Sequence, residues 1–159
     1  MTADTMVIVE RVFPQSRELL FDAWTDPEQM SQWRGSPGWH VEKETVVSQL
    51  RTGGRHHHVK VVDDDPTNRV TTEAIFTEFF RPDVFVALQR ISGDPGMDPT
   101  LTMELRVEFT EYRRHGTLVR VIQGPYEAAE AGKHSTGWEL EMQRLADFLE
   151  SRGGSGGQR

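Results

Sequence analysis

The sequence contains no cysteine among its 159 residues. This absence excludes disulfide bonds, thiolate zinc sites and cysteine nucleophiles, and it favours a reducing compartment. Basic residues are in the minority, since 18 lysines and arginines stand against 25 acidic residues, for a net charge of −7. The densest basic stretch, Arg113-Arg114-His115, precedes an expected turn. A surface that binds phosphate backbones needs clustered basic residues, so we expect no nucleic-acid partner.

Long apolar runs and targeting signals are scarce as well. No segment approaches the roughly 20 apolar residues of a membrane-spanning helix. Residues 1–7 contain no basic segment followed by an apolar stretch, as a signal peptide would. We therefore expect a cytoplasmic protein without membrane contact. No glycine-rich phosphate loop, nucleophile elbow or complete metal-ligand motif occurs, so we predict no cofactor and no metal.

The chain begins with a predicted strand and two helix starts. Residues 6–13 are rich in β-branched and aromatic side chains, which is typical of a strand. Ser16 is a suitable N-cap for a helix over residues 17–24. Asp26-Pro27 predicts a second short helix that ends near Trp33, because aspartate caps well and proline fits the first helical position.

From Trp39 onward the pattern predicts strands separated by turn clusters. The β-like segments are residues 39–48, 55–62, 70–80, 84–91, 101–109 and 118–123. Their short connections favour an antiparallel meander over a parallel sheet. In the fifth segment the apolar residues alternate with polar ones, so one sheet face is predicted to be buried and the other wet. These apolar residues are Leu101, Met103, Leu105, Val107 and Phe109.

A long helix is predicted to follow the sheet. Thr136 and Glu139 have the spacing of a capping box and mark its expected start. An apolar stripe predicts the buried face, and it consists of Trp138, Met142, Leu145 and Leu149, with Phe148 beside it. The residues expected mainly outside are Glu139, Glu141, Gln143, Arg144 and Asp147. Residues 153–159 are rich in glycine and serine and predict a flexible tail after a single domain over residues 1–152.

The sequence thus predicts an α+β fold in which a curved antiparallel sheet of about seven strands wraps around the C-terminal helix. Two short helices lie between the first and second strands. This helix is the only large element available to cover the apolar face of the sheet. A sheet curved around one helix commonly leaves a void beside the short helices, and such voids bind small molecules.

Several motifs occur in an order typical of one family. They are Phe13-Pro14, residues 20–28 (LFDAWTDPE) with Trp33, residues 50–55 (LRTGGR), residues 78–83 (EFFRPD), residues 115–117 (HGT) and residues 137–140 (GWEL). With them the chain resembles the helix-grip superfamily (SRPBCC), which includes Bet v 1-like and START lipid-transfer domains. More narrowly, it resembles the bacterial branch related to the C-terminal domain of the activator of Hsp90 ATPase. The resemblance covers about residues 7–149. It implies the helix-grip fold, but the superfamily includes lipid carriers, cyclases, hydrolases and hormone receptors.

The most unusual stretch is Arg55-His56-His57-His58. On a strand, His56 and His58 share one face and His57 points to the other. Alternation with Val59 and Val61 would turn His57 inward, whereas the family pattern places aromatic residues where His56 and His58 stand. We favour His56 and His58 facing inward, because imidazoles keep the size of the aromatic rings they replace. Two imidazoles at this spacing could hold a metal or a substrate carboxylate, and a zinc site would need a third ligand. They could also act as general base and acid near neutral pH.

The other candidate ligand-binding residues surround the expected cavity. Trp33 and Trp39 flank the loop that forms the cavity mouth in the family that the chain resembles. Met103, Trp138 and Met142 are expected to face the interior, where methionine can border an adaptable cavity. Packing in the core is the alternative for each of these residues, and for Trp138 it is the favoured one.

Three functions are compatible with these patterns. The first is binding of a small apolar or amphipathic molecule in a cavity lined mainly by aliphatic and aromatic side chains. The second is a cyclase- or hydrolase-type enzyme that uses His56 or His58 for proton transfer, with Arg55 or Glu78 orienting the substrate. The third is a chaperone-related protein interaction through the outer surface. We favour ligand binding, and the first strand with the exposed sheet face could also support a homodimer.

Overall fold

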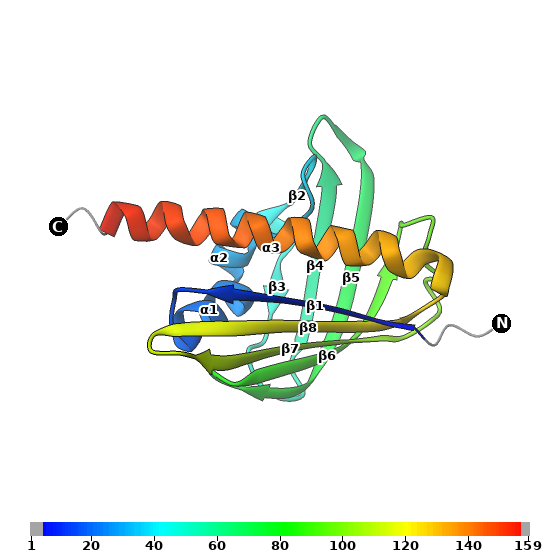
Figure 1. The fold of residues 1–159 in the computed structure, drawn as a ribbon. Helices are drawn as coiled ribbons and strands as arrows, with labels where there is room; N and C mark the ends of the chain where they lie inside the picture. Colours follow the sequence, from blue (N-terminus) through cyan, green and yellow to red (C-terminus); the bar gives the residue numbers. More distant parts are fainter. Residues whose placement is uncertain (1–4, 157–159) are drawn as a thin grey trace.

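The computed structural model describes residues 5–156 and has a curled antiparallel sheet that holds a long C-terminal helix (Figure 1). Strand β1 (Thr5–Phe13) leads into helices α1 (Arg17–Thr25) and α2 (Pro27–Trp33). Ser16 caps α1 as predicted, since its Oγ accepts a hydrogen bond from the Leu19 amide at 3.2 Å. Asp26 precedes α2 without a side-chain cap bond. Both short helices therefore start where the sequence indicates.

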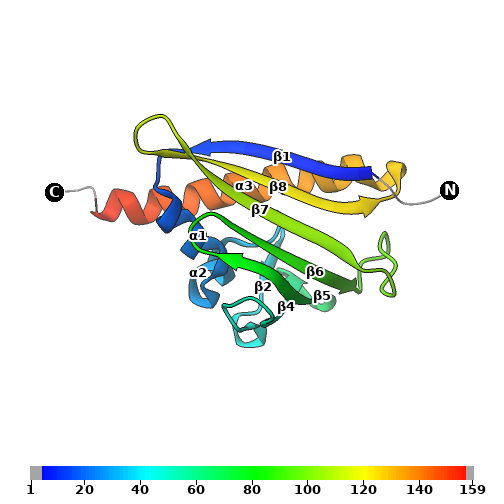
Figure 2. The same cartoon turned by 90° about the horizontal axis from the view of Figure 1, so that it is seen from below.

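The remaining strands follow in a meander. They are β2 (Trp39–Val41), β3 (Val47–Ser48), β4 (Arg55–Val62), β5 (Asp65–Phe80), β6 (Val84–Ser92), β7 (Met103–Tyr112) and β8 (Gly116–Tyr126). The order across the sheet is β1-β8-β7-β6-β5-β4-β2, with β3 pairing separately to β4, and every pairing is antiparallel. This half-barrel and its long helix confirm the predicted α+β helix-grip fold, seen from a second side in Figure 2.

Several predicted strand boundaries are wrong. Strand β5 begins at Asp65 and not at residue 70, and β7 and β8 extend three residues beyond their predicted ends. The segment over residues 39–48 is not one strand, because the 3-10 turn η1 (Lys43–Thr45) separates β2 from β3. The Thr45 hydroxyl donates to the Glu42 carbonyl at 2.6 Å and stabilises this turn. Leu101 lies before β7 and is 51% exposed, whereas the rest of the predicted alternation from Met103 to Phe109 is buried. A side chain outside the ladder does not follow the period of the strand.

Helix α3 (Ala128–Gly156) begins earlier than the capping box predicts. Thr136 lies inside the helix, where its Oγ1 donates to the Gly132 carbonyl at 3.1 Å instead of capping. The preceding Ala-Ala-Glu-Ala sequence forms helix readily and extends the element towards the N-terminus. The helix also continues through Gly156, into the segment predicted as a tail, and residues 157–159 lie outside the described part.

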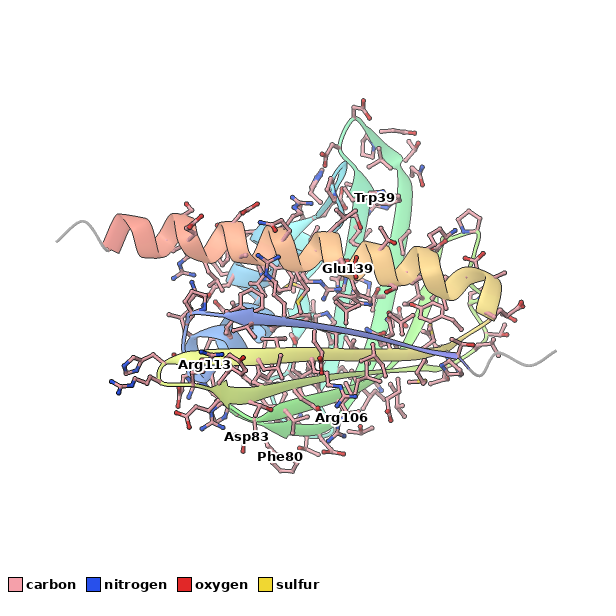
Figure 3. All side chains as sticks on the ribbon, viewed as in Figure 1. Trp39, Phe80, Asp83, Arg106, Arg113 and Glu139 are labelled. Atoms are coloured by element: carbon pink, nitrogen blue, oxygen red, sulfur yellow. The ribbon has the colours of Figure 1, made fainter. Side chains whose placement is uncertain are left out.

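The predicted apolar stripe of α3 packs against the concave face of the sheet. Trp138, Met142, Leu145 and Leu149 are all buried there. Figure 1 shows α3 running along β1 and β8, with α1 and α2 beneath its C-terminal half. Glu139 is exposed on this helix, and Phe80 and Arg106 lie on the side of the sheet away from it (Figure 3). The interior thus lies between one helix and one curled sheet.

Candidate functional site

A pocket of about 300 Å³ opens between the N-terminal half of α3 and strands β4, β5, β6 and β8. We call it the main pocket. Its polar lining residues include Arg34, Lys60, Gln89, Gln123, Tyr126 and Glu141, and its apolar lining residues include Trp39, Val70, Ile91, Met97 and Trp138. Trp39 reaches it from β2, beside α3 (Figure 3). The expectation of a mainly aliphatic and aromatic lining is therefore wrong, because charged and amide groups make up about half of the wall.

A buried ion pair forms one side of the main pocket. Arg34 Nε donates to Glu141 Oε1 at 2.9 Å, and the Gly35 amide donates to the same oxygen at 3.0 Å. The prediction that Glu141 lies outside is wrong, since this residue is only 6% exposed. Burial raises the pKa of Glu141, but the charges of Arg34 and Lys60 and the Gly35 amide outweigh it, and the pKa is lowered overall. Glu141 therefore remains a carboxylate.

Three tryptophan rings surround the Arg34 guanidinium. Its central carbon lies 5.7 Å from the ring centres of Trp24 and Trp33 and 5.1 Å from that of Trp138. A guanidinium at this range is attracted by the negative faces of the rings. The aromatic core thus holds the cation that in turn holds Glu141.

The outer rim of the pocket is fastened by Arg144. Its Nη1 donates to the carbonyls of Gly35 and Trp39, both at 2.8 Å, and to that of Ser36 at 3.1 Å. The sequence places Arg144 on the outside of the helix, but it is only half-exposed, because it satisfies the carbonyls of the loop between α2 and β2. This contact fixes the loop that leads to Trp39 at the start of β2.

A chain of hydrogen bonds lines the floor. Gln123 Oε1 accepts from Tyr126 Oη at 2.6 Å and from Trp138 Nε1 at 2.7 Å. Gln123 Nε2 donates to Gln89 Oε1 at 2.8 Å. Burial raises the pKa of Tyr126, so its hydroxyl remains a donor. The network holds Trp138 and Tyr126 at fixed positions around the pocket.

Lys60 extends from β4 into the same pocket and is partly buried. Within residues 5–156 no ion pair or hydrogen bond joins its ammonium to another side chain. Desolvation lowers the pKa of Lys60, Glu141 raises it and Arg34 lowers it, and the result is a pKa below the usual value. Lys60 is therefore an amine inside a cavity, available to a ligand.

His56 and His58 face inward on β4, and His58 is only 2% exposed. His56 Nε2 lies 2.8 Å from His58 Nδ1, and His56 Nδ1 lies 3.0 Å from Ser48 Oγ. Burial, followed by the charge of Arg34, lowers the pKa of His56 to about 4 and that of His58 well below its usual value. Both rings are therefore neutral near pH 7. His58 Nε2 has no hydrogen-bond partner among the described residues.

The sequence leaves open whether His57 or the pair His56 and His58 faces inward on β4, and the structure answers this question. His57 lies on the opposite face, where its Nδ1 is 2.9 Å from the Thr45 carbonyl. Val59 and Val61, which share that face, are also buried. Both faces of β4 are covered at this point, so the alternation of the valines and the inward histidines are compatible.

The remaining sequence candidates separate into pocket and core. Trp39 and Trp138 line the main pocket, and His56 and His58 line a small adjoining void of about 30 Å³ that also contacts Arg34 and Gln89. Trp33 is buried in the core, where its Nε1 donates to the Ala23 carbonyl at 2.9 Å. Met142 is a core residue as well. Met103 lines a separate surface pocket with Pro125 and Tyr126.

Sequence reasoning misses Arg34, Lys60, Gln89, Gln123 and Glu141. A signal for the two glutamines exists, because each occupies an inward position of its strand. Gln89 continues the alternation of Phe85 and Ala87, and Gln123 continues that of Val119 and Val121. A polar residue that takes the place of an apolar one on a buried face marks a polar interior.

Two further kinds of feature are absent from the described chain. Residues 5–156 contain no group of three or more histidine and acidic side chains placed to hold a metal ion. None of the helices in this part of the protein has the length and apolar character needed to span a membrane.

Comparison with known proteins supports the fold. Residues 14–150 match the family described as Activator of Hsp90 ATPase homolog 1-like protein. A search of curated proteins finds no match. Solved structures with the same fold include protein CV1439 from Chromobacterium violaceum, with 16% identity, a TM-score of 0.79 and coverage of 91% of this chain and 96% of that one.

Two other similar structures differ in how closely their folds match this one. The AHSA1 protein SPO3351 from Silicibacter pomeroyi has 18% identity and a TM-score of 0.76, over 93% of this chain and 99% of that one. CalU16 from Micromonospora echinospora has 17% identity and a TM-score of 0.65, over 91% of this chain and 75% of that one. At these identities the likeness concerns the fold, and function has to be argued from the pocket.

Proposed function

We propose, for a chain that belongs to the Activator of Hsp90 ATPase homolog 1-like family, that the main pocket binds a small amphipathic molecule. The observation that carries this proposal is a pocket wall that contains both charged and amide groups and large apolar side chains. An oxygen of the ligand accepts a hydrogen bond from Lys60, and its apolar body packs against Trp39, Ile91 and Trp138. The volume of about 300 Å³ is at the lower end of small-molecule sites, which measure roughly 300–1,000 Å³.

Gly137 offers a way to close the pocket without disturbing the fold. This glycine lines the pocket on α3, and a Cβ added to it would meet only Ser36 Oγ, at 3.7 Å. Leucine is a good helix former, and because Gly137 lines the pocket we expect its side chain to occupy part of the cavity. Gly132 lies on the same helix, does not line the pocket, and has no atom within 4 Å of the position that a Cβ would take. Gly132→Leu is thus a matched control.

The test uses anilinonaphthalene sulfonate, a fluorescent amphipathic anion, titrated into the wild type and both variants. We expect the wild type and Gly132→Leu to bind alike and Gly137→Leu to lose affinity by about tenfold or more, since filling a cavity removes its contacts. Indole N–H signals in NMR spectra of the wild type should shift for Trp39 and Trp138 but not for Trp33. Equal binding by all three proteins would contradict the proposal.

A histidine-dependent enzyme is the second candidate, because His58 Nε2 points to a void and has no partner among the described residues. The low pKa of His56, about 4, argues against this role, because efficient general bases have a pKa near the working pH. Hydrolysis of p-nitrophenyl acetate tests it. Turnover that disappears in His58→Gln while anilinonaphthalene sulfonate still binds would place catalysis ahead of simple binding.

A further inference from the structure

The three lysines of the sequence have different surroundings. Lys43 is exposed and its Nζ pairs with Glu28 at 2.8 Å. Lys133 is exposed at the pocket rim and its Nζ pairs with Glu130 at 3.2 Å. Lys60 alone extends from the sheet into the main pocket, and no ion pair or hydrogen bond of its ammonium occurs within residues 5–156. A charged amine left without a partner inside a cavity needs a reason, because desolvation of the charge is costly.

We propose that Lys60 is a nucleophilic amine that captures aldehydes or ketones in the main pocket as a Schiff base. This inference rests on the proposed binding function and specifies its ligand class as carbonyl compounds with an apolar body. A carbonyl fits the pocket because it is an uncharged acceptor that can approach Lys60 without bringing a second charge beside Glu141.

The chemistry balances without any co-reactant. The neutral amine of Lys60 adds to the carbonyl carbon, a C–N bond forms, and the nitrogen proton passes to the oxygen to give a carbinolamine. The carbinolamine then loses its hydroxyl together with the remaining nitrogen proton as water, which leaves a C=N bond to Nζ. The reaction is reversible, so the pocket releases the carbonyl compound when water adds back.

The pocket supplies the conditions that such an amine requires. Desolvation lowers the pKa of Lys60, which increases the fraction of neutral amine. Titratable and charged groups from several elements face Lys60. Helix α3 contributes Glu141, His134 and Lys133, and the end of α2 contributes Arg34. The others are Asp94 from the loop after β6, Tyr126 from β8 and His58, which lies on β4 like Lys60. The proton that the ammonium loses passes to water, because Glu141 remains a carboxylate paired with Arg34 and the Tyr126 hydroxyl already donates to Gln123.

The experiment compares the three lysines in one tube. The intact protein is incubated with benzaldehyde and sodium cyanoborohydride, which reduces a Schiff base to a stable benzyl amine, and the modified lysines are quantified by peptide mass spectrometry. A reaction governed by exposure would favour Lys43 and Lys133. We expect instead that Lys60 is labelled about tenfold faster than Lys43, as a desolvated amine in a binding pocket should be.

Two variants separate capture in the pocket from general reactivity. Gly137→Leu should reduce labelling of Lys60 and leave that of Lys43 unchanged, whereas Gly132→Leu should change neither. Lys60→Arg should remove the pocket adduct while circular dichroism shows an unchanged fold. Labelling of Lys60 no faster than that of Lys43 would overturn the inference.

The two proposals can fail separately. If Lys60 is not labelled preferentially while anilinonaphthalene sulfonate binds and Gly137→Leu prevents it, the Schiff base is wrong and the binding function stands. If neither probe distinguishes Gly137→Leu from the wild type, the binding function fails and the Schiff base fails with it. Benzyl alcohol, which has the same ring but no carbonyl, should compete with benzaldehyde weakly and leave no adduct.

Discussion

The interior of this protein has two regions that differ in how they are filled. Under α1 and α2, Phe21 packs edge-on against Phe79 and Phe85, with ring centres 5.2 and 6.0 Å apart, and lies 5.2 Å from Phe109. We call this region the aromatic half. Under the N-terminal half of α3, the pocket half contains an ion pair, two glutamines and a cavity of about 300 Å³. The same sheet carries both regions.

The border between the two halves crosses single strands. On β6 the inward positions pass from Phe85 and Ala87 to Gln89, and on β8 they pass from Val119 and Val121 to Gln123. Apolar side chains close the space between sheet and helix, whereas amides satisfied by each other hold rings apart and leave room for a ligand. Along the same strands, the inward residues are thus apolar in the aromatic half and include Gln89 and Gln123 at the main pocket.

The largest expected effect is in the aromatic half. Phe21→Ala should lower the free energy of unfolding by about 3–5 kcal/mol, because it leaves a cavity among rings that cannot collapse into it. Urea denaturation monitored by tryptophan fluorescence measures the loss. A loss as small as that for an exposed leucine such as Leu140 would show that this half is not the packed core.

Breaking the buried ion pair should cost nearly as much. Glu141→Gln leaves Arg34 buried without a counter-charge, and we expect a loss of about 3 kcal/mol in urea denaturation. The double variant Arg34→Met with Glu141→Leu should recover most of that stability, since it buries no charge. A double variant that loses as much stability as the single variants Arg34→Met and Glu141→Leu together would contradict this prediction.

Acid should weaken the wild type through the same carboxylate. The pKa of Glu141 is lowered in the folded protein, so its contribution is complete above the ordinary pKa of glutamate and is lost as the pH falls through the lower folded value. The Glu141→Gln variant should lack this part of the acid destabilisation. Parallel stability profiles of the two proteins below pH 4.5 would contradict it.

Disrupting the amide network should cost less stability than breaking the ion pair. Gln123→Met keeps the volume of the side chain but leaves the Trp138 indole and the Tyr126 hydroxyl without their acceptor, at a cost of about 1–3 kcal/mol. Its distinctive sign should be a shift of the Trp138 indole N–H signal in NMR spectra, with that of Trp33 unchanged. Because Trp33 bonds to a backbone carbonyl, it serves as the internal control.

The smallest expected effect is the contribution of His56 to the pH dependence of stability. Its pKa falls from 6.5 to about 4 on folding, so the unfolded chain binds a proton in this range that the folded protein excludes. Stability is therefore complete above pH 6.5 and declines as the pH falls towards 4. His56→Gln should remove on the order of 1–2 kcal/mol of this decline, an amount limited by the partial exposure of the ring. An unchanged profile from pH 6.5 to 4 would contradict it.

Most of the fold could be predicted from local patterns. The bounds of β4 and the end of α2 at Trp33 agree with the prediction, because β-branched runs, helix caps and turn residues act within a few positions of one another. The predicted start of α3 is wrong, since Thr136 has the residue type of a capping box but lies in a longer run of helix formers. The site could be predicted only in part. Glu141 lies between Trp138 and Met142 on the helix. A carboxylate can be buried at this position only because Arg34, more than one hundred residues away in the sequence, neutralises its charge.

The sequence by itself determined the order of strands and helices and the apolar faces that bring them together, because hydrophobic periods and turn residues are local properties. Only the tertiary structure decided that Arg34, Lys60 and Glu141 meet on one side of a cavity. The physical reason is that a charge can be buried only where its partner arrives from another element, and the curl of the sheet around α3 fixes which elements meet.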